Sequence, residues 1–155
     1  MTRLTRLAAG SLAATALLGT AALPADAHTG MHHGWRVVIG EVQYNSPGSD
    51  DYSRRSLAAE WVTITNTGRQ RVDLSGWTLA DTARHVYRFE DLTLRGYESV
   101  RVRTGSGLDT ERDVYQGSRT YIWNNDGDTA ILRNDRGRFM DAKSWGRDRK
   151  YHHHR

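Results

Sequence analysis

Six of the seven histidines of this 155-residue chain lie near its two ends, and imidazole nitrogen is a ligand for copper and zinc. If an export signal is cleaved after Ala27, His28 offers an α-amine and a ring nitrogen to the same metal ion. The pattern predicts a copper or zinc site, and the alternative is a pair of polar tails with incidental metal affinity. The candidate ligands are His28, His32, His33, His152, His153 and His154.

Arginines form a second candidate site. Arg101 and Arg103 alternate with valines, so they share the solvent face of a predicted strand. Together with a basic tail that holds Arg147, Arg149 and Lys150, they predict a surface for a polyanion such as DNA or a wall polymer. A solvated sheet face is the alternative, because acidic residues are interleaved with the arginines.

No arrangement of residues predicts catalysis. The seventh histidine, His85, stands alone in a predicted strand, and the chain has no cysteine and no Gly-x-Ser-x-Gly nucleophile motif. Asp126-Gly127-Asp128 has oxygen ligands for calcium but lacks the spacing of a twelve-residue calcium loop, which favours a turn. We therefore expect a protein that is not an enzyme and has no resident cofactor, while an unrecognised hydrolase site stays open.

The first 27 residues predict export by the general secretory route. Arg3 and Arg6 precede an uncharged apolar stretch over residues 7–23, and Ala25 and Ala27 fit the small-residue cleavage pattern. We expect a signal peptide over residues 1–27, a secreted product and no membrane span after cleavage. The alternative is an uncleaved anchor.

Cleavage would leave 128 of the 155 residues and would remove Arg3, Arg6 and Asp26, which lowers the net charge from +4 to about +3. That length predicts one domain. Without cysteine the domain cannot form disulfides, so burial must hold it together, and five Trp, seven Tyr and two Phe supply large apolar side chains.

The pattern after residue 35 is that of short strands separated by Gly, Asn, Asp and Ser. We expect a flexible His/Gly-rich segment over 28–34, an all-β domain over 35–146 and a basic His-rich tail over 147–155. Alternation places Val62 and Ile64 in the core. Gly76 allows a tight entry to the strand that ends at Leu79, and Trp77 and Leu79 are expected to join the same core. The expected strands are 35–44, 60–66, 72–79, 85–89, 92–104, 121–123, 129–133 and 138–145, with polar loops over 45–56 and 105–118.

Several short sequence motifs occur in a recognisable order. They are Val38–Asn45, Glu60–Asn66, Leu74–Leu79 (LSGWTL), Asn125–Leu132 (NDGDTAIL) and Gly137–Asp141. In these motifs the chain resembles the lamin tail domain family, whose domains also occur in secreted and surface proteins of bacteria. The resemblance implies an immunoglobulin-like β-sandwich of seven to nine short, mostly antiparallel strands.

The same resemblance implies a binding or scaffold module, and it carries over no functional residue. The expected function is therefore a secreted, non-enzymatic module that acts at the cell surface or in the medium. Its partner would be an unknown protein or a cell-wall ligand. Copper or zinc binding and polyanion binding stay as alternatives.

Overall fold

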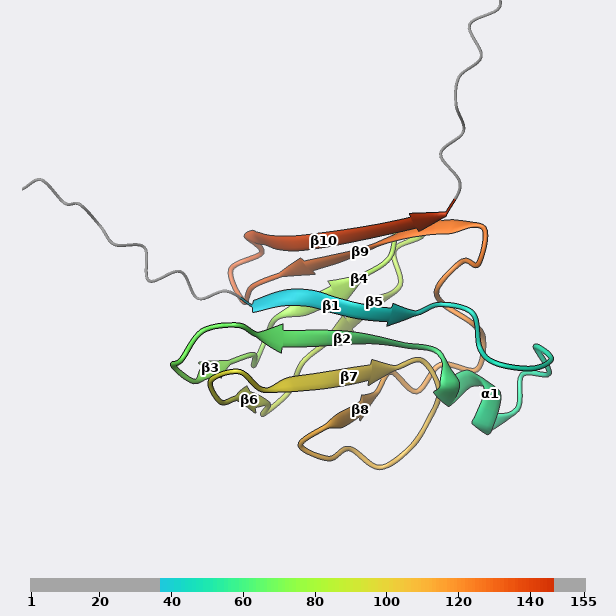
Figure 1. Cartoon of the computed structure of the whole chain (residues 1–155), viewed down its shortest axis with the longest axis horizontal. Coiled ribbons are helices and arrows are strands. Elements are labelled where there is room, and N and C mark those ends of the chain that lie inside the picture. The colour runs from blue at the N-terminus through green and yellow to red at the C-terminus, as the bar shows by residue number, and fades with distance from the viewer. Residues whose placement is uncertain (1–36, 147–155) are drawn as a thin grey trace, which may run out of the picture. The chain divides into compact units, whose positions relative to one another are not determined.

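Two four-stranded sheets face each other across a shared apolar core (Figure 1). The computed structural model describes residues 37–146, which contain ten strands and one short helix, α1 (Arg54–Ala59). The strands are β1 (Val37–Gln43), β2 (Trp61–Asn66), β3 (Val72–Asp73), β4 (Thr78–Ala80), β5 (Val86–Arg88), β6 (Thr93–Leu94), β7 (Ser99–Arg103), β8 (Asp113–Tyr115), β9 (Gly127–Arg133) and β10 (Phe139–Gly146).

The first sheet has the order β1-β2-β7-β8 and the second has the order β10-β9-β4-β5. Strands β3 and β6 form a separate two-stranded ladder. All pairings are antiparallel except that of β7 with β8. There are ten strands rather than the expected seven to nine, because the expected strand 72–79 is divided into β3 and β4, the expected strand 92–104 is divided into β6 and β7, and β8 was not expected.

Alternation along the strands builds the core. On the first sheet, Ile64 of β2 lies opposite Val100 of β7, and both side chains are completely buried. On the second sheet, Leu79 of β4 lies opposite Leu132 of β9, and both are equally buried. Side chains of this kind stabilise the fold by about 1.5–3 kcal/mol each. The buried cluster includes the expected core residues Val62, Ile64, Trp77 and Leu79.

The turn before β4 requires a glycine. Gly76 has a φ of +81°, in the left-handed region, and its N–H donates to the carbonyl of Phe89. The next residue, Trp77, then enters the core with its side chain buried. This geometry accounts for the Ser-Gly-Trp motif in the sequence.

Three expectations about single elements were wrong. Helix α1 lies where a loop was expected up to residue 56; it begins at the Ser53 cap and buries Leu57, but six residues are too few to show a helical period. Strand β8 lies in the expected loop 105–118, because its pairing with β7 needs only three residues. Residues 121–123 form no strand, because the Ile122 and Trp123 amides donate to a buried side chain, Glu60, instead of a ladder.

Side chains of β10 bind the outer edge of β1. The Ile39 N–H donates to Oδ2 of Asp141 at 2.8 Å, and Nζ of Lys143 donates to the carbonyl of Gly40. These bonds join the two sheets along one side of the sandwich. The helix that residues 37–146 contain, α1, is much too short to cross a bilayer.

Candidate functional site

A polar groove lies on the outer face of the first sheet, with a volume of about 670 Å³. Its floor is a row across three strands, in which Arg101 of β7 lies opposite Thr63 of β2 and Asp113 of β8. These side chains point outward because their strand neighbours fill the core. The lining comprises Glu41, Thr63, Arg95, Glu98, Ser99, Val100, Arg101, Glu111, Arg112 and Asp113.

Trp61 orients the arginine at the centre of the groove. The guanidinium carbon of Arg101 lies 4.9 Å from the centroid of the Trp61 ring, which is a cation–π contact between neighbouring rows of β2 and β7. A guanidinium held over a ring keeps N–H donors at its edge for other partners. Arg101 is exposed, so those donors are accessible from the groove.

A bulge in β1 supplies one wall. The register with β2 shifts between Ile39 and Val42, and this shift leaves Glu41 exposed at the groove. Glycine suits the preceding position, because a Cβ on Gly40 would lie 3.2 Å from the hydroxyl oxygen of Thr65. At the bulge the Gly40 backbone therefore lies close to the side chains of Thr63 and Thr65, and the bulge directs a carboxylate toward the groove.

The groove holds both signs of charge in nearly equal number: three arginines and four carboxylates line it. Arg95 and Glu98 form an exposed ion pair at 3.6 Å, and the carboxylate of Glu98 also accepts the Arg95 N–H. Glu111 and Arg112 are exposed on the opposite wall, before β8. The lining therefore offers hydrogen-bond donors and acceptors side by side, without a dominant charge.

The structure separates the two arginines that the sequence grouped as a polyanion site. Arg101 lies in the groove, whereas Arg103 makes internal bonds: its Nε donates to Asp113 at 2.6 Å and its Nη1 to the carbonyl of Ala58 at 2.7 Å. Arg103 thus ties α1 to β7 and β8. The other predicted members, Arg147, Arg149 and Lys150, lie outside the described residues.

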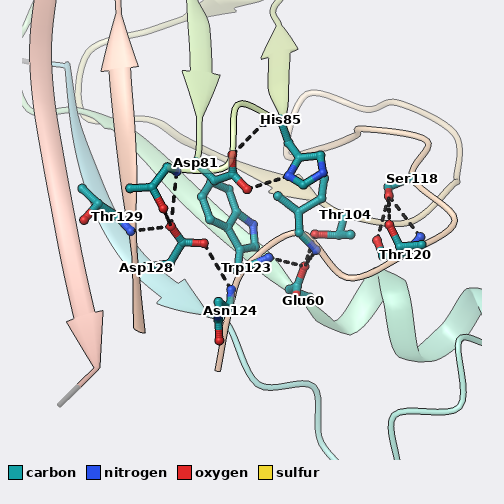
Figure 2. A network of polar contacts seen from close by, with 12 residues as sticks. Glu60, Asp81, His85, Thr104, Ser118, Thr120, Trp123, Asn124, Asp128 and Thr129 are labelled. Atoms are coloured by element: carbon teal, nitrogen blue, oxygen red, sulfur yellow. Dashed lines mark hydrogen bonds and ion pairs between the residues drawn. The ribbon is translucent and has the colours of Figure 1, made fainter. Parts of the chain in front are cut away.

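His85 is paired with a buried carboxylate. Its Nδ1 lies 2.6 Å from Oδ2 of Asp81, and its backbone N–H donates to Oδ1 of the same residue (Figure 2). The His85 side chain is 51% exposed and that of Asp81 is buried. Within residues 37–146 no hydroxyl group bonds the imidazole, so the pair lacks the nucleophile of a hydrolase triad. The Asp81–His85 pair instead closes the turn between β4 and β5.

Glu60 organises the loops at the α1 end of the sandwich. Its Oε1 accepts from Oγ1 of Thr104 at 2.5 Å and from the N–H groups of Ile122 and Trp123 at 3.0 and 3.2 Å (Figure 2). Glu60 is completely buried, and its Oε2 has no partner among the described residues. Burial raises the pKa of this carboxyl above its ordinary value, against the opposing effect of the three hydrogen bonds.

The acidic segment 126–128 leads from a turn at residues 125–126 into β9, which begins at Gly127. Oδ1 of Asn124 accepts the Asp126 N–H, and Asp128 is buried, where it accepts from Thr82, Asn124 and Thr129. Its oxygens are therefore used for loop amides and a hydroxyl rather than for calcium. In the described part of the chain no three His, Asp or Glu side chains are grouped to hold a metal ion. The six predicted histidine ligands lie outside that part.

These features assign the chain to a structural class: it is an immunoglobulin-like β-sandwich with a polar groove on one outer face. The sequence model of the Lamin Tail Domain family matches residues 32–147. The chain belongs to this family, as its sequence resemblance indicated. A search for similar curated proteins gave no match.

Sequence reasoning missed most of the groove. Of its lining, the polyanion prediction placed Arg101 in the site. Glu41 is directed there by a bulge, and Glu111, Arg112 and Asp113 belong to a segment that was expected to be a loop. A usable signal is Asp113-Val114-Tyr115, where a β-branched and an aromatic residue stand together between polar segments, as in a short strand.

Proposed function

We propose that this protein is a secreted, non-enzymatic binding module that holds a cell-wall polymer in the groove of its first sheet. The observation that carries the proposal is the groove itself, whose volume of about 670 Å³ falls in the range of ligand sites and whose lining residues are all polar or charged except Val100. Membership of the Lamin Tail Domain family supports a non-catalytic module. The predicted signal peptide supports export.

The lining favours an uncharged, polyhydroxylated polymer over a polyanion. Each sugar hydroxyl donates one hydrogen bond and accepts others, so it pairs equally with a guanidinium such as Arg101 and with a carboxylate such as Glu111. A polyanion would meet Glu41 and Glu111, which are exposed in the same groove. Surface ion pairs are also weakened by salt, so the two ligand classes differ in their salt dependence.

Co-sedimentation with purified bacterial cell wall tests the proposal. The protein, with His28 as its first residue, is mixed with wall polysaccharide across a series of salt concentrations. We expect retention that resists salt, and its loss in Arg101→Ala and Glu111→Ala. Arg119→Ala is the matched control, because Arg119 is an exposed arginine of a loop that does not line the groove. Retention that collapses with salt would favour the polyanion alternative, and no retention at any salt would reject wall binding.

Copper or zinc binding by the terminal histidines is a second proposal, supported by the grouping of six imidazoles in the sequence. It requires the α-amine of His28, so one extra residue before His28 should abolish tight copper binding. Calorimetric titration of both forms with copper is the measurement. Equal affinity of the two forms, or affinity weaker than micromolar, would contradict it.

A further inference from the structure

The outer face of the second sheet carries an apolar row that crosses all four strands. Val86 of β5 lies opposite Ala80 of β4, which lies opposite Ile131 of β9, which lies opposite Ala142 of β10. Cross-strand partners share a face, and these residues point away from the core because Leu79, their strand neighbour in β4, points into it. Val86 is 60% exposed, although β-branched apolar residues are usually buried.

The adjacent row on the same face carries two arginines and a phenylalanine. In it, Arg88 of β5, Thr78 of β4, Arg133 of β9 and Phe139 of β10 lie in register. Phe139 is 59% exposed. Each arginine donates through Nη1 to a turn carbonyl, at 2.9 Å for Arg88 and 3.2 Å for Arg133, which holds its guanidinium group near the end of the sheet. Within residues 37–146 neither arginine has a carboxylate partner.

We propose that this face, with its apolar row and its arginine row, binds an acidic protein segment that also carries apolar side chains. Carboxylates of the partner would pair with Arg88 and Arg133, since guanidinium groups bind carboxylates through two parallel hydrogen bonds. Apolar side chains of the partner would cover Val86, Ile131 and Phe139, which removes exposed apolar area from water. The rows lie two residues apart along each strand, at Thr78 and Ala80 of β4. An extended segment therefore matches both rows when an acidic residue is followed, two positions on, by an apolar residue on the same face.

Charge complementarity decides between this occupant and two others. A second copy of the chain, packed symmetrically on the same face, would bring arginine rows together, and like charges repel. The chain's own flanking residues also lack the required charge: segments 28–36 and 147–155 contain one acidic residue, Asp148, among basic ones. An acidic partner is the occupant that both rows accommodate.

Fluorescence anisotropy with a labelled peptide of the repeat Glu-Ser-Val-Ser (the Glu–Val peptide), which places Glu and Val on the same face when extended, tests the proposal. A peptide of the repeat Lys-Ser-Val-Ser (the Lys–Val peptide) is the charge-reversed probe. We expect salt-sensitive binding of the Glu–Val peptide, weakened about tenfold in Arg88→Glu/Arg133→Glu because two surface pairs are reversed. The same double variant should gain binding of the Lys–Val peptide, a result that misfolding cannot produce. Arg119→Glu, an exposed arginine of a loop outside this sheet, is the control and should bind the Glu–Val peptide like the wild type. Ile131→Ser should weaken binding at every salt concentration, because it removes apolar contact.

Three outcomes would overturn the proposal. The first is equal affinity of the wild type and the double variant for both peptides. The second is a dimer in sedimentation equilibrium that Ile131→Ser dissociates, which would assign the face to a second copy. The third is retention on phosphatidylserine vesicles, lost in the double variant, without any binding of the Glu–Val peptide.

Discussion

Replacing Glu60 should have a large effect on stability although the residue touches no ligand surface. In Glu60→Ala, the hydroxyl of Thr104 and the amides of Ile122 and Trp123 lose their shared acceptor inside the protein. An unsatisfied buried donor costs about 1–3 kcal/mol, so three of them predict a loss of roughly 3–9 kcal/mol. That is a large part of the 5–15 kcal/mol, roughly, by which a small domain is stable.

Glu60→Gln is the matched variant, because it keeps the oxygen that accepts the three bonds. It places an amide nitrogen where Oε2 has no partner among the described residues, which predicts a smaller loss of about 1–2 kcal/mol. Urea denaturation followed by tryptophan fluorescence measures both variants, and the buried Trp123 reports directly on the loop. Equal losses in the two variants would refute the assignment of the effect to the shared acceptor.

The pH dependence gives an independent check. Burial raises the pKa of Glu60 above its ordinary 4.5, so the folded chain keeps a proton that the unfolded chain has lost. The contribution of this group to the free energy of unfolding is therefore fully present below pH 4.5 and is lost as the pH rises through the pKa of the folded state. We expect the stability of the wild type relative to Glu60→Gln to fall over that range. A relative stability that rises with pH would show that the buried carboxylate is stabilised as an anion.

Three further predictions concern packing and the internal ion pair. Gly96→Ala should destabilise the fold by about 1–3 kcal/mol in urea denaturation, because the new Cβ would lie 2.2 Å from the carbonyl oxygen of Arg69; a neutral result would contradict the close approach. Ile64→Ala should cost about 2–5 kcal/mol, since Ile64 is completely buried between the sheets, and a loss below 1 kcal/mol would argue against that packing. Arg103→Lys keeps the charge but cannot reach Asp113 and the α1 carbonyl together; we expect a loss of about 1 kcal/mol and faster amide exchange in α1, and unchanged exchange would contradict the tie.

The sequence predicted the elements in which apolar alternation is long enough to read. β2 and the β9–β10 hairpin around residues 134–137 were foreseen, because β-branched residues alternate with polar ones or a strong turn signal joins two runs. α1 was not foreseen, because it has only six residues and one of its carbonyls is bonded by Arg103 of β7. β8 was not foreseen, because it is held by its ladder with β7. Local propensity carries little information about such short elements.

The two outer faces were harder still to predict. The groove requires that Glu41, Arg101 and Glu111 converge from separate strands and loops, and this convergence depends on a bulge and on a parallel pairing. The apolar row of the second sheet requires the register of four strands, which the sequence does not state. Side-chain periodicity predicts which residues leave the core, whereas only the register shows which of them meet.

The bonds from β10 to β1 have a consequence for assembly. An uncovered strand edge is a template on which further chains can add, and this is how many sheet proteins aggregate. In this sandwich Asp141 occupies the amide of Ile39 and Lys143 occupies the carbonyl of Gly40, so an incoming strand finds these β1 groups already bonded. Two charged side chains thereby protect this part of the β1 edge against the addition of another strand.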